Sequence, residues 1–209
     1  MRRYFITGTD TDCGKTYITA SLVSSLVNAA AIKPIASGCI EKEGQLISSD
    51  VYQLQKATHL DKEIINPWLF KSPVSPHIAA VEEGVLLSAA EIADYCLNVQ
   101  LPGIEYLFIE GAGGLMVPLN NDETWIDFLK IAKLPVILVV GMKLGCLNHT
   151  LLTESVLQAH NIFCHGWIAN CIDAEMLALS ANIETLQRKL RAPLLAIVPY
   201  GEGISTLTL

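Results

Sequence analysis

The architecture of this chain follows from one glycine-rich segment, Gly8-Thr9-Asp10-Thr11-Asp12-Cys13-Gly14-Lys15-Thr16. An apolar run, Arg3–Thr7, precedes the segment and apolar residues at helical spacing follow it, so it is predicted to link a buried strand to a helix. A phosphate-binding loop requires this context, because the loop and the first helical turn present backbone N–H groups to an anion. Five residues separate Gly8 from Gly14, one more than in the common form of the motif.

Short apolar runs alternate with helical patterns along the rest of the chain. The predicted strands are Arg3–Thr7, Ala31–Ala36, Tyr106–Ile109, Val136–Val140, Phe163–Ala169 and Leu194–Val198. The predicted helices are Lys15–Asn28, Asp50–Thr58, Ser88–Gln100 with a Ser88/Glu91 capping box, Thr124–Ala132, Asn148–Gln158 and Ala174–Leu190. Strands that are apolar on both faces and separated by helices form parallel sheets covered on both sides. We therefore expect one three-layer α/β domain over residues 1–209, with a mostly parallel central sheet.

Composition excludes several classes of protein. The 209 residues are 51% hydrophobic and 17% charged, with a formal net charge of −7. The apolar content argues against disorder, and the negative charge argues against nucleic acid or an anionic membrane surface as a partner. The most apolar stretch, Leu134–Met142, is followed by Lys143 and is far shorter than the roughly 20 residues of a membrane-spanning helix.

The cysteines and the amino terminus indicate the compartment. Six cysteines are scattered without a Cys-x-x-Cys motif: Cys13, Cys39, Cys96, Cys146, Cys164 and Cys171. This pattern favours free thiols over disulfides or a zinc site. The start, MRRYFITG, does not resemble a signal peptide. We expect a cytoplasmic protein.

Charged residues near the predicted strand ends are the candidates for chemistry. In a phosphate-binding loop, Lys15 neutralises phosphate oxygens and the Thr16 hydroxyl ligates Mg²⁺. Glu110 closes an apolar strand and precedes Gly-Ala-Gly-Gly, as expected of the second half of a nucleotide–Mg²⁺ site, or of a solvated strand end. Lys33 is either a second cation at the phosphate site or a surface lysine. Asp50 is either a third Mg²⁺ ligand or a helix cap.

Three further segments remain open on pattern alone. Residues 141–149 form a strand-to-helix turn whose free N–H groups are suited to a carboxylate, or are an ordinary turn. Asn170 follows an apolar strand and either reads a purine edge or caps a turn. His77 lies in a proline-rich stretch that is predicted to be a loop.

The motifs GTDTDCGKT, KPIASG, SSD, SPHIAA, EGAGGLMVPL, VVGMKLGCLNHTLLT and WIAN together resemble the dethiobiotin synthetase family, in order and over nearly the whole chain. The longer loop spacing is itself a trait of that family. The resemblance implies a P-loop NTPase-like fold and a homodimer that uses ATP, Mg²⁺ and CO₂ (or bicarbonate) to close the ureido ring of 7,8-diaminononanoate. The implied reaction passes through a carbamate and a carbamic–phosphoric anhydride, and yields dethiobiotin, ADP and phosphate.

The resemblance also implies roles for individual residues. Lys33 and Lys15 would be catalytic, and the Mg²⁺ ligands would be Thr16, Asp50 and Glu110. The ATP site would consist of Asp12, Cys13, Gly14, Lys15, Thr16, Tyr17, Asp50, Glu110, Gly111, Ala112, Gly113, Asn170, Cys171, Pro199, Tyr200 and Gly201. The substrate would contact Thr11 and Ser37, and its carboxylate would meet the partner subunit at Gly145, Cys146, Leu147 and Asn148.

The chain departs from the family pattern at three places. Asp12 stands where many relatives have glutamate, the segment Val27–Ile32 is short, and the tail after Tyr200 is short, with Glu202 a candidate for the last adenine contact. The main alternative is a ParA/MinD-like switch ATPase. Its loop would carry an additional lysine where this chain has Thr9-Asp10-Thr11.

Overall fold

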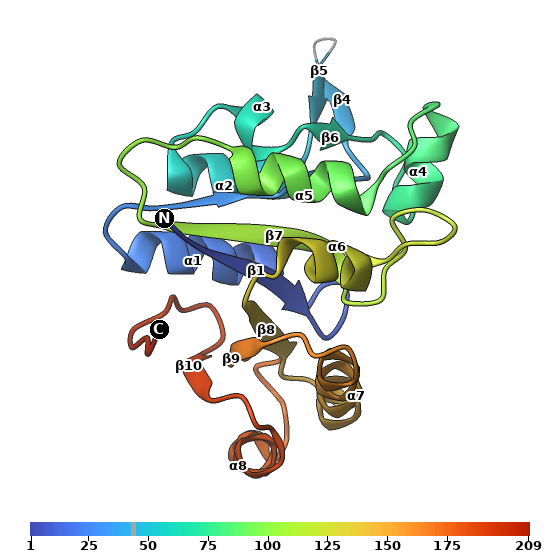
Figure 1. The fold of residues 1–209 in the computed structure, drawn as a ribbon. Coiled ribbons are helices and arrows are strands. Elements are labelled where there is room, and N and C mark those ends of the chain that lie inside the picture. Colours follow the sequence, from blue (N-terminus) through green and yellow to red (C-terminus); the bar gives the residue numbers. More distant parts are fainter. Residues whose placement is uncertain (43–44) are drawn as a thin grey trace.

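The computed structural model, which describes residues 1–42 and 45–209, is built around a six-stranded parallel sheet (Figure 1). The strand order is β10-β9-β8-β1-β7-β2, and every neighbouring pair is parallel. These strands are β1 (Arg2–Gly8), β2 (Ala29–Ile32), β7 (Tyr106–Gly114), β8 (Val136–Gly141), β9 (Cys164–Asn170) and β10 (Leu194–Val198). The predicted three-layer α/β fold is confirmed.

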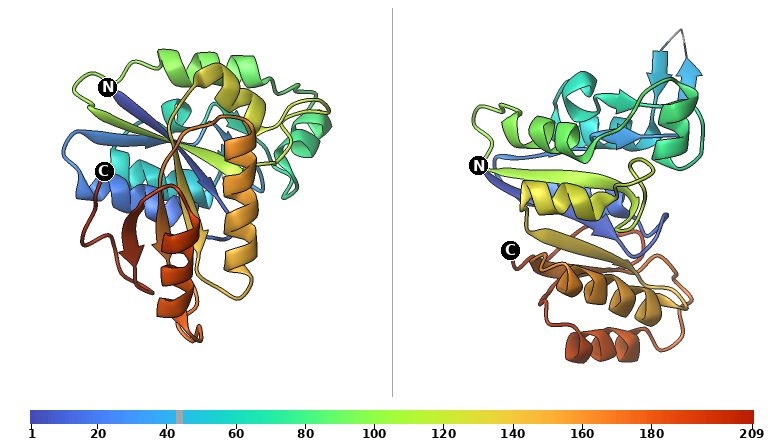
Figure 2. Two further views of the ribbon diagram at one scale, coloured as in Figure 1. Left: turned by 60° about the horizontal axis from the view of Figure 1, so that its bottom comes forward. Right: turned by 45° about the vertical axis from the view of Figure 1, so that its right-hand side comes forward.

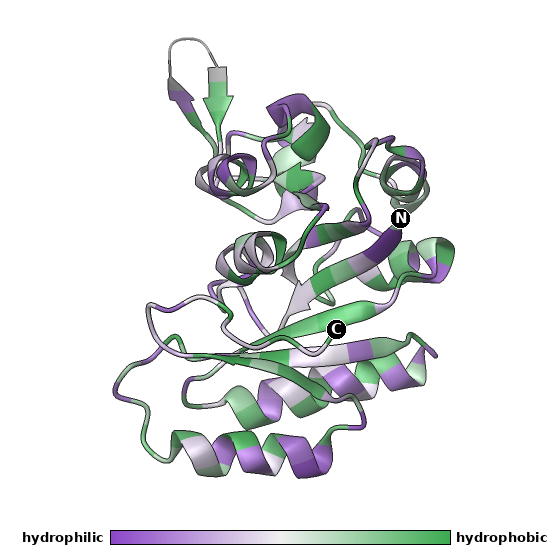
Figure 3. Cartoon of the chain, turned by 90° about the vertical axis from the view of Figure 1, so that its left-hand side faces the viewer, coloured by the Kyte–Doolittle hydropathy of each residue, from purple (hydrophilic) through white to green (hydrophobic). Residues whose placement is uncertain are grey.

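Helices cover both faces of the sheet (Figures 1 and 2). On one face, α1 (Lys15–Ser25) and α2 (Ser49–Thr58) pack against the sheet together with apolar residues of the C-terminal tail. The other face is covered by α5 (Ala89–Asn98), α6 (Trp125–Ala132), α7 (Cys146–Ala159) and α8 (Leu179–Lys189). Figure 3 shows hydrophobic strands between helices that alternate hydrophobic and hydrophilic residues, as a doubly covered sheet requires.

Local sequence explains why several elements begin and end where they do. All six residues of β8 are buried, in a run of β-branched and leucine side chains that favours a central strand. The α6 helix begins with a capping box in which Thr124 accepts from the helix backbone and Asp127 accepts from the Thr124 N–H. By contrast, the predicted Ser88 capping box does not form: the Ser88 side chain makes no capping hydrogen bond, and at this helix start the Ala89 N–H donates to the side chain of Glu123.

The region between β2 and α5 differs most from the prediction. It contains the strands β3 (Ile35–Ala36), β4 (Ile40–Lys42), β5 (Gln45–Ile47) and β6 (Trp68–Leu69), and the helices α3 (Lys62–Ile65) and α4 (Pro76–Glu82). The predicted single strand Ala31–Ala36 is wrong, since β2 ends at Ile32 and β3 pairs with β6 in a separate sheet. The prediction that His77 lies in a loop is also wrong, because His77 lies on α4.

Two other helices have a predicted end that is wrong by three or more residues. α1 ends at Ser25 rather than Asn28, and Asn28 has a positive φ of 57°. α8 starts at Leu179 rather than Ala174, after Ala178 adopts a left-handed conformation. None of the helices in the described ranges has both the length and the apolar character needed to cross a lipid bilayer.

Candidate active site

The loop between β1 and α1 is held by a glycine and an asparagine. Gly14 precedes α1 in a left-handed conformation with φ of 83°, which glycine adopts without steric cost. A Cβ atom at Gly14 would also overlap the Asn170 side chain. The buried Asn170 amide donates to the Cys13 carbonyl at 2.9 Å. Asn170 thus fixes the loop to the end of β9.

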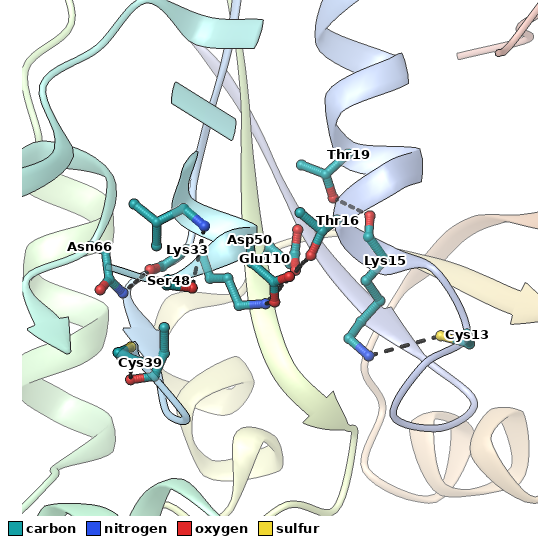
Figure 4. Close-up of polar contacts among 12 residues, drawn as sticks. Cys13, Lys15, Thr16, Thr19, Lys33, Cys39, Ser48, Asp50, Asn66 and Glu110 are labelled. Carbon is teal, nitrogen blue, oxygen red and sulfur yellow. Dashed lines mark hydrogen bonds and ion pairs between the residues drawn. The ribbon is translucent and has the colours of Figure 1, made fainter. Parts of the chain in front are cut away.

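Lys15 lies within this loop with its ammonium turned back over the backbone (Figure 4). The side chain is only 6% exposed, and Nζ donates to the Asp10 carbonyl at 2.9 Å. The Cys13 sulfur lies 3.8 Å from the same Nζ. The Lys15 ammonium therefore lies near the backbone N–H groups at the start of α1. Its positive charge and these N–H groups both favour the binding of an anion.

Lys33 is the centre of a second cluster, which joins four elements of the fold (Figure 4). Its Nζ donates to Asp50 Oδ2 and, at 2.8 Å, to Glu110 Oε1. Thr16 Oγ1 lies 3.5 Å from Lys33 Nζ and donates to Glu110 Oε1 at 2.6 Å. Lys33 is buried beside the phosphate-binding loop rather than exposed at the surface. Asp50 is not the N-cap residue of α2, which is Ser48, and its carboxylate belongs to the Lys33 cluster.

Electrostatics keep Lys33 protonated. Burial disfavours the charged form, but the Glu110 and Asp50 carboxylates outweigh it, so the pKa of Lys33 is raised above its ordinary value. Glu110 is fully buried, while 44% of the Asp50 side chain is exposed. The cluster therefore meets solvent on the Asp50 side.

The oxygen atoms of this cluster fit a magnesium ion. Thr16, Asp50 and Glu110 offer a hydroxyl and two carboxylates, which are the hard donors that Mg²⁺ prefers. Glu110 Oε2 is buried without a hydrogen-bond partner in the structure, although buried carboxylate oxygens are normally satisfied. A cation bound there would supply the missing partner.

A cavity of about 430 Å³ opens over both lysines. From the loop and α1 it is lined by Thr11, Asp12, Gly14, Lys15, Thr16 and Tyr17. From other elements it is lined by the predicted residues Lys33, Ser37, Asp50, Glu110, Ala112 and Gly113. The structure thus gathers twelve predicted site residues around one space, together with Ala36 and Gln53, which the sequence analysis did not single out. The spacing could have identified Gln53, since it lies three residues after Asp50 on α2 and so on the same side of the helix.

Residues assigned to adenine lie outside this cavity, at the ends of β9 and β10. The Cys171 N–H donates to the Val198 carbonyl at 2.9 Å, which joins the two strand ends. Tyr200 is exposed in the turn that follows β10. Tyr17 Oη donates to the Glu202 carbonyl at 2.7 Å and links the tail to α1. Cys13 is buried beneath the loop, and Gly111 is a buried residue of β7.

The segment assigned to the substrate carboxylate also lies apart from Lys33. Gly145 precedes α7 with φ of 93°, and Cys146, Leu147 and Asn148 form its first turn. An ion pair connects this turn to the loop: Lys143 Nζ lies 2.9 Å from Asp10 Oδ2. A second cavity, of about 380 Å³, lies between the loop, the residues after β7 and the α7 face. Thr11 lines both cavities.

Comparisons with known proteins agree on the class of protein. A family model described as an AAA domain matches residues 2–207. A Legionella pneumophila (strain Paris) protein described as ATP-dependent dethiobiotin synthetase BioD is 61% identical, over all of this chain and 99% of the relative. A Pseudoalteromonas translucida protein with the same description is 44% identical, over 97% of this chain and 92% of the relative.

Solved structures share the fold at low sequence identity. The septum site-determining protein MinD from Pyrococcus horikoshii, complexed with Mg-ADP, has a TM-score of 0.57 and 19% identity, and the match covers 95% of this chain and 81% of that one. A ParA-family ATPase from Chlorobium tepidum has a TM-score of 0.55 and 16% identity, over 96% and 85% of the two chains. These likenesses show that the chain shares the arrangement of sheet and helices of the MinD and ParA structures.

Proposed function

Because the chain belongs to the ATP-dependent dethiobiotin synthetase family, we propose that it closes the ureido ring of dethiobiotin from 7,8-diaminononanoate and CO₂ at the expense of ATP. The observation that carries this proposal is the convergence of Lys15 and the Lys33 cluster on one cavity beside the phosphate-binding loop. That cavity combines a place for the phosphates with a buried, protonated lysine for a second anionic group.

The chemistry divides into three steps. The 7-amino nitrogen of the diamine adds to CO₂ and loses a proton, which gives a carbamate. A carbamate oxygen attacks the γ-phosphorus of ATP and ADP leaves, which gives a carbamic–phosphoric anhydride. The 8-amino nitrogen then attacks the carbonyl carbon of the anhydride, and phosphate leaves as the ring closes. Positioning and charge stabilisation are the main contributions that a protein makes to phosphoryl transfer.

The two lysines have different tasks in this proposal. Lys15, the first residue of α1, neutralises the transferring phosphate, because within the described residues its ammonium hydrogen-bonds Asp10 O and Cys13 Sγ and forms no ion pair with a carboxylate. Lys33 enters from the opposite side of the cavity on the β2–β3 connection. Its ammonium stabilises the carbamate and the charge that develops between carbamate and phosphate.

Mg²⁺ is proposed to bind at Thr16, Asp50 and Glu110, where the orphaned Glu110 oxygen lies. When bound, the ion neutralises charge on the phosphate oxygens of ATP. Thr16 and Glu110 are already joined by a 2.6 Å hydrogen bond, so the protein holds these two ligands in place. Asp50 on α2 completes the set from the exposed side.

Substrate and nucleotide are proposed to enter from different sides. Thr11 and Ser37 line the cavity and are assigned to the diamine and its carbamate. Loop residues 12–17 and Gly111–Gly113 are assigned to the phosphates, and Asn170, Cys171 and the turn 199–201 to adenine. Because Gly145–Asn148 lie apart from Lys33, we assign them to the carboxylate of a substrate held mainly by the other subunit of a homodimer.

The cytoplasm is the proposed compartment. All six cysteines are free, as in reducing surroundings. Burial raises the pKa of the Cys164 thiol to about 12, which keeps it protonated and unreactive at neutral pH.

The test of the proposed function is ADP release by the purified protein with ATP, Mg²⁺ and bicarbonate, with and without 7,8-diaminononanoate. A synthetase releases ADP only when the diamine is present, and dethiobiotin appears in equal amount. A switch ATPase, the class of the MinD and ParA fold relatives, releases ADP at the same rate without the diamine. That second result would contradict the proposal.

A further inference from the structure

Lys33 occupies a break in the main sheet. β2 ends at Ile32, and the next strand, β3, begins at Ile35 and belongs to another sheet. Lys33 therefore lacks the regular ladder of hydrogen bonds that fixes a residue within a strand. The backbone at Lys33 must be fixed in another way, because its side chain reaches a buried cluster in which small shifts matter.

The segment Ile65–Trp68 provides the missing contacts. The Lys33 N–H donates to the Ile65 carbonyl at 2.8 Å, and the Trp68 N–H donates to the Pro34 carbonyl at 3.0 Å. Between these two bonds, the Lys33 carbonyl accepts from the side-chain amide of Asn66 at 2.5 Å (Figure 4). Within the described part of the chain, Asn66 Nδ2 is the hydrogen-bond donor to the Lys33 carbonyl.

A side chain supplies this bond because the backbone lacks a donor there. The residue between Asn66 and Trp68 is Pro67, which has no N–H. Asn66 lies 7% exposed, and the same amide also reaches the Trp68 carbonyl at 3.3 Å. The amide thus stands in for a ladder bond that Pro67 removes.

We propose that Asn66 is a positioning residue for the reaction: its amide fixes the Lys33 backbone so that the Lys33 ammonium reaches Glu110, Asp50 and the reacting anions. The proposal rests on the proposed function, because it assigns to Lys33 a part in ring closure. Within the described residues, the Asn66 amide donates to the backbone carbonyls of Lys33 and Trp68 and not to the charged atoms of the cluster, so it acts on the Lys33 ammonium through the Lys33 backbone.

The buried side-chain oxygen of Asn66 indicates that this residue does more than fill space in the core. Among the described residues, Asn66 Oδ1 is buried without a hydrogen-bond partner, and a buried unsatisfied acceptor destabilises a fold. Leucine has nearly the shape of asparagine and would leave no such acceptor. The position nevertheless holds an amide, whose two donor contacts go to the carbonyls of Lys33 and Trp68.

The experiment is a double-mutant cycle of Asn66→Leu and Lys33→Ala. Asn66 lines a cavity of about 440 Å³, so the leucine has space beside it. For each protein we would measure kcat for dethiobiotin, KM for the diamine and ATP, and the Kd of ADP. Asn66→Leu alone is expected to lower kcat about 10- to 100-fold, as misplacement of a catalytic group does. The Kd of ADP should change by less than about twofold, because Lys15 and its loop remain in place. In the Lys33→Ala background, the same substitution should lower kcat by less than about twofold, because its effect passes through Lys33.

Asn120→Leu is the matched control. Asn120 Nδ2 also donates to a backbone carbonyl, that of Leu87, at 2.9 Å, and Asn120 makes further hydrogen bonds to Asp122 and Glu123, so its loss has at least as large a structural cost elsewhere. We expect its kcat to stay within about twofold of wild type, since no contact links Asn120 to Lys33.

Two results would overturn the assignment of Asn66. One is an unchanged kcat in folded Asn66→Leu, and the other is an equal fold-loss of kcat with and without Lys33. If Asn66→Leu does not fold, as judged by circular dichroism, Asn66→Ala takes its place in the same cycle with the same expectations. Failure of the proposed function is distinguishable, because then the wild-type protein itself forms no dethiobiotin.

Discussion

Lys33 Nζ lies 2.8 Å from Glu110 Oε1, although 77 positions separate the two residues in the chain. The sheet explains the contact. β2 and β7 run parallel with Ile32 opposite Ile109. Lys33 directly follows the last residue of β2 and Glu110 directly follows Ile109 in β7, so the two side chains start at the same level of the sheet, and they meet beside α1 and its loop.

Removal of the Lys33 ammonium should separate chemistry from nucleotide binding. We expect Lys33→Ala to lower kcat for dethiobiotin about 10²–10³-fold, the usual effect of losing one charge-stabilising donor. The Kd of ADP should change little, because Lys15 and the loop remain. Isothermal titration and product assay measure the two effects. Lys71→Ala is the control, since Lys71 pairs with Glu41 at the surface. Near-normal turnover by Lys33→Ala would contradict a role for Lys33 in the mechanism.

Substitution of Glu110 should change the magnesium requirement. Glu110→Gln keeps the shape but removes a carboxylate from the proposed Mg²⁺ ligands. We expect the Mg²⁺ concentration for half-maximal ADP release to rise at least about 10-fold, since even supporting residues of metal sites affect affinity by 10–100-fold. Chelation by EDTA should stop the reaction and added Mg²⁺ restore it. Glu41→Gln, at an exposed position, should leave the requirement unchanged, and an unchanged requirement in Glu110→Gln would argue against this ligand set.

Alanine substitutions at two glycines of nearly equal φ should distinguish the cost of backbone strain from the cost of steric overlap. Gly14 has φ of 83° and Gly103 has φ of 82°, but a Cβ atom meets Asn170 only at Gly14 and open space at Gly103. Gly103→Ala should lower the free energy of unfolding by about 1–2 kcal/mol, the cost of left-handed alanine. Gly14→Ala should lower the free energy of unfolding by more than Gly103→Ala does. It should also weaken ADP binding because the loop must move. Urea unfolding measures both, and equal losses would mean that the Gly14–Asn170 contact is not tight.

The ion pair between Asp10 and Lys143 should be visible in a titration. The Lys143 hydrogen bond holds the pKa of the Asp10 carboxyl below its ordinary value. The pair therefore stabilises the fold fully above the unfolded-state pKa of about 3.9, and this contribution is lost as pH falls through the lower folded-state pKa. Both side chains are more than a third exposed, so the contribution to stability should be below about 1 kcal/mol.

Lys143→Met should return the pKa of Asp10 towards its ordinary value, as followed by carboxyl ¹³C NMR. Lys130→Met is the matched control, because Lys130 pairs with Asp127 on α6. It should leave Asp10 unaffected. An unchanged Asp10 titration in Lys143→Met would show that the pair does not persist in solution.

The sequence predicted the sheet well because its strands carry a strong local signal. β8 and β10 are continuous apolar runs, and their predicted positions agree with the structure to within one residue. The loop before α1 was found from its glycines and the Gly-Lys-Thr triplet. Parallel strands also place their carboxyl ends together, which is why Lys15 and Glu110 were predicted at one site, whereas Lys33 was assigned to it through the family resemblance.

Other features depend on contacts that no local pattern contains. The break after Ile32 arises because Trp68 and Asn66, more than thirty positions away, take over hydrogen bonding of Lys33 and Pro34. Asp50 could not be assigned from the sequence, since a helix cap and a cluster residue look alike at a helix start. Ser88 shows the reverse error, because a local capping-box pattern was predicted there and the helix start instead receives a side chain from a distant loop, Glu123, on the Ala89 N–H.

The transfer of oxygen from CO₂ to phosphate tests the central claim most directly. In the proposed chemistry a carbamate oxygen attacks ATP and leaves with the phosphate, so ¹⁸O-labelled CO₂ should give dethiobiotin with one labelled oxygen and phosphate with one labelled oxygen. The reaction would be run with ATP, Mg²⁺ and 7,8-diaminononanoate, faster than CO₂ exchanges with water, and analysed by mass spectrometry. Phosphate that carries one ¹⁸O per dethiobiotin is the expected result. Phosphate without ¹⁸O would mean that water attacks ATP, and would contradict phosphoryl transfer to the substrate at Lys33.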